Sequence, residues 1–242
     1  RIKAYEIPEA TRIARGRAIV NIVQIAQDEK INTLMPVQAG LEGNIAFATR
    51  KGLIKKTDIK EFNRINKNAK IAKKLNDGDD LISVVLTTGN SELMIASRSG
   101  KCIRFSESNV RSMGRDTAGV RAMKLGADDC LVDMLVVDES KDVLTVTSNG
   151  FGKRSDLEDY RLQGRAGMGI KAGVFNEVTG YLVNMKQVTD KDDVMIISDG
   201  GTIIRMHCDS ISRIGRNTKG VRLMRLKDGA VATIALTARD ED

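Results

Sequence analysis

The 242-residue sequence is poor in the side chains that most often build catalytic and metal sites. It has one histidine, His207, and three cysteines, Cys102, Cys130 and Cys208, which lie far apart and form no C-x-x-C pair. An odd, scattered set of cysteines argues against a disulfide framework or a zinc site and favours free thiols in a reducing cytosol. We therefore expect no catalytic residue, no metal and no cofactor in this chain, and His207 to be a solvent-facing strand residue.

Long apolar runs and aromatic side chains are scarce as well. No run reaches the roughly 18 apolar residues of a membrane-spanning helix. The opening Arg1-Ile2-Lys3 has neither an initiator methionine nor the pattern of a signal peptide, so we expect a fragment of a longer cytoplasmic protein that begins inside a strand. Aromatic residues make up only 3% of the chain, which argues against binding single-stranded nucleic acid through stacked bases.

Positive charge is in excess. The formal net charge is +7 in a chain that is 41% hydrophobic and 29% charged, a globular composition. Residues 50–74 hold ten basic residues against Asp58 and Glu61, and this excess favours a polyanionic partner. The ten are Arg50, Lys51, Lys55, Lys56, Lys60, Arg64, Lys67, Lys70, Lys73 and Lys74.

An internal repeat organises the sequence. Segments 45–56, 93–104, 143–154 and 194–205 each read as a strand, a tight glycine turn and a second strand that ends in a basic residue. The turn glycines are Gly52, Gly100, Gly150 and Gly201, at spacings of 48, 50 and 51, and the basic residues four places later are Lys56, Arg104, Arg154 and Arg205.

A second motif recurs in phase with the first, a Gly-Arg loop followed by a glycine, a β-branched residue and a basic residue. It reads Gly114-Arg115 then Gly119-Val120-Arg121, Gly164-Arg165 then Gly169-Ile170-Lys171, and Gly215-Arg216 then Gly220-Val221-Arg222. Segments 114–125 and 215–226 agree at eight of twelve positions. Two motifs in phase argue against a chance repeat.

Further β-like stretches complete an all-β fold with about four strands in about fifty residues, which matches a β-propeller better than a solenoid. Those stretches are Leu81–Thr87, Cys130–Val137, Tyr181–Gln187 and Val231–Leu236, and single helical turns are expected at Thr57–Asn63 and Ser155–Tyr160. We predict one domain over 1–242, with units at 1–26 (partial), 28–75, 78–125, 128–178 and 179–226 and a closing strand at 229–238.

The repeated basic residues are the candidate contacts to a polyanion. Turn geometry explains most of the glycines, but the Gly-Arg loops also leave backbone N–H groups open to a phosphate. Recurrence of one charge sign in every unit predicts a basic belt, because we see no structural need for it. The candidates are Lys55, Lys56, Arg104, Arg154 and Arg205 on the repeated strand, and Arg115, Arg165, Arg216, Arg121, Lys171 and Arg222 around the loops. We expect about half of them to be true contacts.

Four stretches resemble the C-terminal domain of the DNA gyrase A subunit: IKAYEIPEATRIARGRAIVNI, KKTDIKEFNRI, SNVRSMGRDTAGVRAMKLG and NGFGKRSDLEDY. The resemblance covers essentially the whole chain. It implies a β-pinwheel, a propeller variant with six blades in the family and about five represented here, whose basic perimeter wraps duplex DNA so that the holoenzyme introduces negative supercoils. It also implies three partners, namely duplex DNA of the bacterial chromosome, the rest of the gyrase A subunit, and the gyrase B subunit. ATP and magnesium would be used elsewhere in the holoenzyme.

The sequence departs from the family at its signature heptad, Gln-basic-Arg-Gly-Gly-basic-Gly. The nearest segment keeps Gln163, Arg165, Gly167 and Gly169 but neither flanking basic residue. In the family the full heptad lies upstream of the segment that matches Tyr5–Ala10, and we expect it, with one blade, to be missing here. Val231–Leu236 should then be a closing strand without neighbours, and the chain should bind DNA yet constrain little writhe.

Three alternatives remain at the level of sequence. The chain could be the corresponding domain of topoisomerase IV, although Tyr5–Ala10 and the regular units favour gyrase. It could be a propeller that docks proteins, which the scarcity of aromatic residues disfavours. An active site is the third, but Tyr5, Tyr160 and Tyr181 have no acidic metal ligands around them in the sequence.

Overall fold

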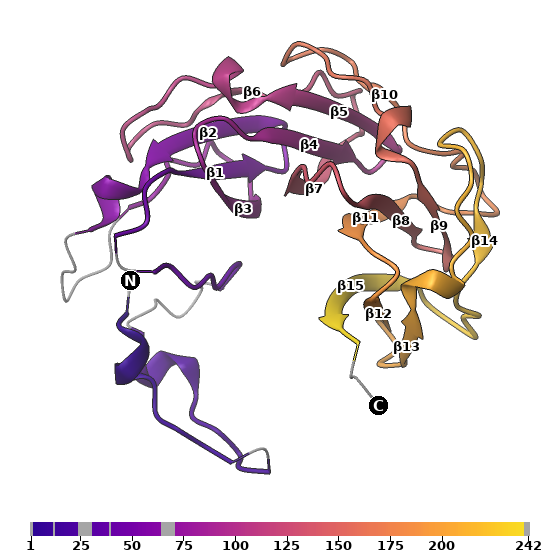
Figure 1. The fold of residues 1–242 in the computed structure, drawn as a ribbon, viewed down its shortest axis with the longest axis horizontal. Coiled ribbons are helices and arrows are strands. Elements are labelled where there is room, and N and C mark those ends of the chain that lie inside the picture. The colour runs from indigo at the N-terminus through magenta and orange to yellow at the C-terminus, as the bar shows by residue number, and fades with distance from the viewer. Residues whose placement is uncertain (1, 12, 24–30, 39, 64–70, 240–242) are drawn as a thin grey trace.

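The computed structural model describes residues 2–11, 13–23, 31–38, 40–63 and 71–239. Within these ranges the chain forms four antiparallel sheets that follow one another along an arc (Figure 1). The strands are β1 (Asn44–Thr49), β2 (Leu53–Asp58), β3 (Leu81–Thr87), β4 (Glu92–Ser97), β5 (Lys101–Ser106), β6 (Val120–Arg121), β7 (Leu131–Val136), β8 (Asp142–Thr147), β9 (Phe151–Ser155), β10 (Ile170–Lys171), β11 (Leu182–Val188), β12 (Asp192–Ser198), β13 (Ile203–His207), β14 (Val221–Arg222) and β15 (Val231–Ala238). The predicted all-β, propeller-like architecture is confirmed.

Each sheet is built on a hairpin with a glycine in its turn. The predicted glycines all have positive φ, from 78° at Gly150 to 91° at Gly52, a conformation that is free for glycine and strained for other residues. At Gly150 a side chain is excluded for a second reason, since a Cβ would lie 2.3 Å from the carbonyl oxygen of Met224. The turn therefore serves both the hairpin and its contact with the following unit.

The outermost strand of a sheet comes from the next repeat unit. The two-residue strands β6, β10 and β14 pair with β2, β5 and β9, respectively. The predicted unit 78–125 does contain four strands, but β4 and β5 belong to the second sheet, whereas β3 and β6 belong to the first. Successive sheets are thus tied together through the backbone, and the outer strands run along the convex side of the arc (Figure 1).

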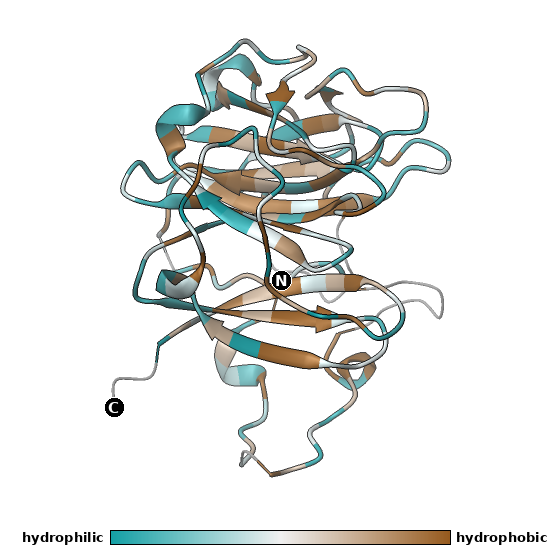
Figure 2. Cartoon of the chain, turned by 90° about the vertical axis from the view of Figure 1, so that its right-hand side faces the viewer, coloured by the Kyte–Doolittle hydropathy of each residue, from teal (hydrophilic) through white to brown (hydrophobic). Residues whose placement is uncertain are grey.

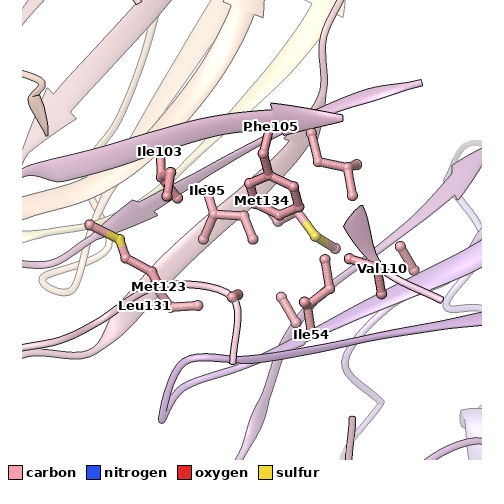
Figure 3. Packing of buried hydrophobic residues seen from close by; sticks show 12 residues of the cluster. Ile54, Ile95, Ile103, Phe105, Val110, Met123, Leu131 and Met134 are labelled. Atoms are coloured by element: carbon pink, nitrogen blue, oxygen red, sulfur yellow. The ribbon is translucent and has the colours of Figure 1, made fainter. Parts of the chain in front are cut away.

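The inner strands β3, β7, β11 and β15 line the concave side, where each contacts its neighbours (Figure 1). Figure 2 shows the sheets stacked in layers, with hydrophobic strands and hydrophilic loops. Three apolar clusters fill the spaces between adjacent sheets. The first cluster joins the first two sheets through Ile54, Ile95, Phe105, Met123 and Met134, all nearly inaccessible to solvent (Figure 3). Burial of this kind supplies most of the stabilising free energy of such sheets.

The expectation of about five blades is wrong for the described residues, which form four sheets, the fourth with only three strands. The described part of 1–26 contains two short 3-10 turns, η1 (Ala4–Glu6) and η2 (Ile19–Asn21), and no strand. Ile2 and Lys3 were expected to continue a strand, but no described strand lies beside them to supply hydrogen bonds; Arg1 lies outside the described residues.

The expectation that Val231–Leu236 lacks neighbours is also wrong. It lies in β15, which pairs with β12 from Asp192↔Ala238 to Ser198↔Val231 and is the inner strand of the fourth sheet. The helical turns are confirmed as η3 (Ile59–Phe62) and η5 (Leu157–Asp159), and equivalent turns follow β5 and β13 as η4 (Glu107–Asn109) and η6 (Cys208–Ser210).

Candidate nucleic-acid interface

The repeated basic residue of each hairpin occupies the same place in all four sheets, although its strand continues for one or two residues beyond it and does not end there as expected. Its partner on the first strand lies six residues before the turn glycine in every case. The pairs are Ala46↔Lys56, Met94↔Arg104, Leu144↔Arg154 and Met195↔Arg205. The four repeated basic residues are therefore structurally equivalent.

The recurring charge sign nevertheless has a structural reason, which corrects our expectation that it has none. In three sheets an acidic residue at or beside the start of the neighbouring strand forms an ion pair with the basic one. The Nε atom of Arg104 lies 2.5 Å from Glu92, that of Arg205 lies 2.7 Å from Asp193, and the Arg154 guanidinium lies 3.5 Å from Asp142. In these sheets the base neutralises an acid of its own sheet.

The first sheet has Asn44 in place of that acid, and Lys56 turns to the next sheet instead. Its Nζ lies 3.3 Å from the buried carboxylate of Glu107. Lys56 and Arg154 are each only 7% exposed, and Lys55 is fully buried. Lys55, Lys56 and Arg154 are therefore placed for internal contacts and not for direct contact with a large ligand.

The arginines of the Gly-Arg loops donate hydrogen bonds to backbone carbonyls on the convex side of the arc, which we call the outer wall. Arg165 donates from Nε to the carbonyl oxygen of Asn109 at 3.1 Å and from Nη1 to that of Arg121. Arg216 repeats this arrangement with Asp159, at 3.0 Å, and Lys171. Arg115 reaches the Ile71 carbonyl at 3.4 Å. All three guanidinium groups remain partly exposed, so that contact with a phosphate stays a prediction for them.

The basic residues of the outer strands are the most accessible of the predicted set. Arg121, Lys171 and Arg222 are exposed and end β6, β10 and β14. They face Leu53, Lys101 and Phe151 across the sheet, and the Arg222 guanidinium lies 4.8 Å from the centre of the Phe151 ring. Because the outer strands follow the convex side of the arc, these three charges form a row along it, which we call the outer row.

A hollow with a cavity volume of about 590 Å³ lies beside the outer row in the second sheet. Its charged lining is mixed, with the basic residues Arg98, Lys101 and Lys124 and the acidic residues Asp128 and Asp129. Lys101 also faces Lys171 in the register of β5 and β10, and two like charges directly opposite each other are unfavourable without an anion between them. The pair of Lys101 and Lys171 is therefore placed to attract a counter-ion.

Several exposed basic residues near the loops were missed, because the sequence analysis named only the basic residues that belong to the two repeated motifs. Arg111 and Arg161 lie three residues before the loop glycines Gly114 and Gly164, and Lys124 and Arg225 lie five residues after the next glycine. Their constant offset from the repeat was the available signal. Of the ten basic residues in 50–74, Arg64, Lys67 and Lys70 lie outside the described residues.

The loop that resembles the family heptad carries the one positive φ found at a non-glycine residue in the described ranges. Ala166 has φ of 68°, where the family heptad has glycine. Gln163 donates its backbone N–H to the carbonyl of Arg104 at 2.8 Å, and Gly169 has φ of 69° with a Cβ position 2.4 Å from the Cys102 carbonyl oxygen. The loop backbone thus keeps glycine-like geometry at Ala166 and Gly169.

We predict that Ala166→Gly stabilises the domain modestly. A left-handed conformation costs an L-residue about 1–2 kcal/mol, and the greater flexibility of glycine in the unfolded chain offsets about half of this. Thermal unfolding should show a small rise in midpoint, with Ala172→Gly, at a buried position without positive φ, as a control that lowers it. A lower midpoint for Ala166→Gly would contradict the prediction.

His207 and the three cysteines are the remaining side chains of a kind that can carry chemistry. His207 ends β13 about half exposed, with Nδ1 2.6 Å from Asp193. The three cysteines are free. In the described part of the chain no group of three or more histidine, cysteine or acidic residues could hold a metal ion, and no helix there is long and apolar enough to cross a membrane.

The comparisons with known proteins agree over the whole arc. A family profile described as the DNA gyrase C-terminal domain, beta-propeller, matches residues 1–38, 43–88, 91–138, 141–189 and 192–237. The chain is 42% identical over 247 residues to the DNA gyrase A subunit of Staphylococcus epidermidis and 45% identical over 225 residues to that of Escherichia coli K12. These alignments cover 100% and 93% of this chain, which spans only 28% and 26% of the two relatives.

Solved structures share the fold. The C-terminal domain of DNA topoisomerase IV superposes with a TM-score of 0.86 over 93% of this chain and 72% of that one, at 24% identity. The DNA gyrase A C-terminal domain gives 0.84 over 96% of this chain and 76% of that one, also at 24% identity. At these identities the two structures establish architecture alone. With the profile matching nearly the full length, the chain belongs to the DNA gyrase C-terminal domain family.

Proposed function

We propose that this domain binds duplex DNA along the convex side of its arc and bends it, as the wrapping domain of DNA gyrase. The observation that carries the proposal is the outer row, since Arg121, Lys171 and Arg222 occupy equivalent exposed positions on three successive sheets. Equivalent charges on a curved wall match a polyanion that follows that wall.

The physical basis is release of counter-ions and deformation of the duplex. Each lysine or arginine that neutralises a phosphate releases condensed ions, and bending a short site smoothly costs of order 1–6 kcal/mol, which the summed contacts must offset. The described residues include no helix longer than a single 3-10 turn, so a recognition helix in the major groove has no support. The remaining mode is recognition of the DNA backbone and of its deformability, with little sequence preference.

In the complete protein this domain would act without an active site of its own. We propose that it presents DNA to the rest of the gyrase A subunit, which pairs with the gyrase B subunit to form a type II topoisomerase. That holoenzyme would hydrolyse ATP with magnesium outside this chain. The bacterial cytoplasm, on chromosomal DNA, is the proposed location. The curated relatives, which are named as gyrase proteins, support this assignment over topoisomerase IV.

A salt series tests DNA binding directly. We expect micromolar or weaker affinity for a duplex at physiological salt and, with about six phosphates contacted, a slope of log K against log salt near −5. Fluorescence anisotropy with a labelled duplex measures both. Affinity that stays constant from low to high salt would contradict an electrostatic interface.

A topology assay tests wrapping separately. Because the heptad is incomplete at Gln163–Gly169, contacts along the path should be interrupted, and an unsupported duplex relaxes toward its straight form. We expect the domain to bind relaxed plasmid but, after treatment with a nicking-closing enzyme, to leave little or no shift in linking number. Shifts equal to those from a protein that carries the full heptad would show that the incomplete loop suffices.

A further inference from the structure

Two lysines lie inside the outer wall, directly beneath Gly-Arg loops. Lys55 and Lys153 each follow a turn glycine by three residues, and their exposures are 0% and 2%. Lysine is almost never buried to this extent unless it is paired, because removing an ammonium from water is costly. The contacts of the two Nζ atoms therefore need an explanation.

The hydrogen-bond partners of both ammonium groups are mostly backbone carbonyls, those of the Gly-Arg loops and, for Lys55, that of Ala72 as well. Lys153 donates to the carbonyl oxygens of Gly215 at 3.1 Å, Thr218 at 2.9 Å and Arg216, and to the hydroxyl of Thr218 at 3.2 Å. Lys55 donates to Ala72 at 2.6 Å and to Arg115. The positive charge of each is thus shared with peptide dipoles, and no carboxylate of the described residues forms an ion pair with either.

The same position in the other two sheets shows that a loop can be supported without this charge. It is occupied by Ile103 and Ile204, and the Cδ1 atom of Ile103 packs 3.5 Å from the Cβ position of Gly167 in the loop above it. An apolar side chain therefore fills the space. What Lys55 and Lys153 add is a positive charge under the outer wall.

Each buried ammonium underlies backbone that positions the outer row. The loop held by Lys153 carries Arg216, which donates to the Lys171 carbonyl, and continues into β14 with Arg222. The loop held by Lys55 continues into β6 with Arg121. A phosphate placed against the outer row would thus lie over the loops that these lysines support.

Burial also brings the pKa of both groups closer to neutral pH, although both remain mostly charged at pH 7. Burial lowers the pKa of Lys55 to about 8; Lys73 and Arg115 act in the same direction and Asp116 opposes them. Burial likewise lowers the pKa of Lys153 to about 8; Arg216 adds to the shift, and Asp159 and Cys102 oppose it. Lys73, which donates to the Ala118 carbonyl, also has a lowered pKa because of burial, opposed by Asp79.

We infer that Lys55 and Lys153 are positioning residues whose protonation is coupled to DNA binding, so that the domain takes up protons when it binds a duplex. The inference rests on the proposed function. A phosphate near a buried ammonium favours the charged form, and by linkage the charged form favours the phosphate. Binding should therefore weaken as pH rises through 8, although neither lysine touches DNA.

Loss of folding does not mimic this effect. The folded pKa of each lysine lies below its unfolded value of about 10.4, so the unfolded chain binds more protons between about pH 8 and 10, and these two groups make the folded domain more stable as pH rises there. Weaker DNA binding in that window is thus separable from instability.

The experiment compares the 242-residue protein with Lys55→Met/Lys153→Met, whose side chains keep most of the length but carry no charge. Calorimetric titration with a short duplex at pH 8.5, in two buffers of different ionisation enthalpy, measures proton uptake. If DNA raises each pKa by about one unit, the wild type should take up about one proton more than the variant, and its affinity should fall about tenfold per lysine between pH 7 and pH 10 relative to the variant.

Lys55→Arg/Lys153→Arg is the second variant, since arginine keeps the charge and does not titrate. It should bind as tightly as the wild type at pH 7 and lose the extra proton uptake at pH 8.5. Equal proton uptake by the wild type and either variant would overturn the inference. If the proteins still bind DNA at pH 7 in that case, the proposed function stands. If the wild type fails to bind at pH 7 in low salt, the proposed function itself fails.

Discussion

Replacing Arg121, Lys171 and Arg222 together with glutamine should weaken binding to duplex DNA about 100-fold at physiological salt and reduce the salt slope by about 2.7, because each lost phosphate contact removes about 0.9 from it. The three side chains are exposed and end the outermost strands, so the substitutions leave the three apolar clusters intact. Anisotropy titrations across a salt series measure both quantities.

A charge-matched control separates position from net charge. Lys141→Gln/Lys191→Gln/Arg239→Gln removes the same three charges at residues that directly precede β8 and β12 and follow β15, away from the outer strands. It should leave the salt slope within about one contact of the wild type. If the control weakens binding as much as the outer-row variant, the charge of the whole domain matters and the outer row has no special role.

The repeat and its turns were predictable because they are local. A hairpin with a glycine of positive φ between two short strands leaves a clear pattern within twelve residues. Leu81–Thr87 was predicted with the bounds of β3, and Cys130–Val137 differs from β7 by one residue at each end.

The exchange of outer strands was not predictable from pattern. Val120-Arg121 and its counterparts form strands of two residues, too short to show any periodicity. Their assignment to the preceding sheet depends on contacts between segments more than sixty residues apart, such as Leu53↔Arg121. Only the packing of whole sheets decides it.

The ion pairs of the repeated base could have been found in the sequence. Glu92, Asp142 and Asp193 each precede their arginine by twelve residues, and Asn44 stands at that distance from Lys56. Acid and base at a fixed spacing across a hairpin indicate a cross-strand pair. The burial of Lys55 and Lys153 had no such signal, since the carbonyls that accept their hydrogen bonds belong to loops up to 65 residues later.

Replacing Glu107 with leucine should lower the free energy of unfolding by about 3–5 kcal/mol, the usual effect of breaking a buried ion pair. The Glu107 carboxylate is fully buried and accepts hydrogen bonds from the Thr87 hydroxyl and from the backbone N–H groups of Gly89 and Ser91, each at 2.7 Å. Leucine is the residue found at the equivalent position 157, so its size and shape suit the fold. The loss of unfolding free energy should therefore come from the lost hydrogen bonds and ion pair of Glu107, and not from steric crowding by leucine.

Two measurements identify those partners as the cause. Asn44→Asp/Glu107→Leu gives Lys56 the cross-strand acid that the other sheets possess, and it should recover part of the loss but not the part due to Thr87, Gly89 and Ser91. Burial alone would raise the pKa of Glu107, but the hydrogen bonds and Lys56 lower it overall. A carboxylate with a lowered pKa stabilises the folded state at pH values above its pKa in the unfolded chain. This stabilisation is lost as pH falls through its pKa in the folded protein. The wild type should accordingly lose more stability than Glu107→Leu between about pH 5 and pH 3. Parallel stability curves for the two proteins over that range, followed by thermal unfolding, would mean that the Glu107 carboxylate contributes nothing to holding the first two sheets together.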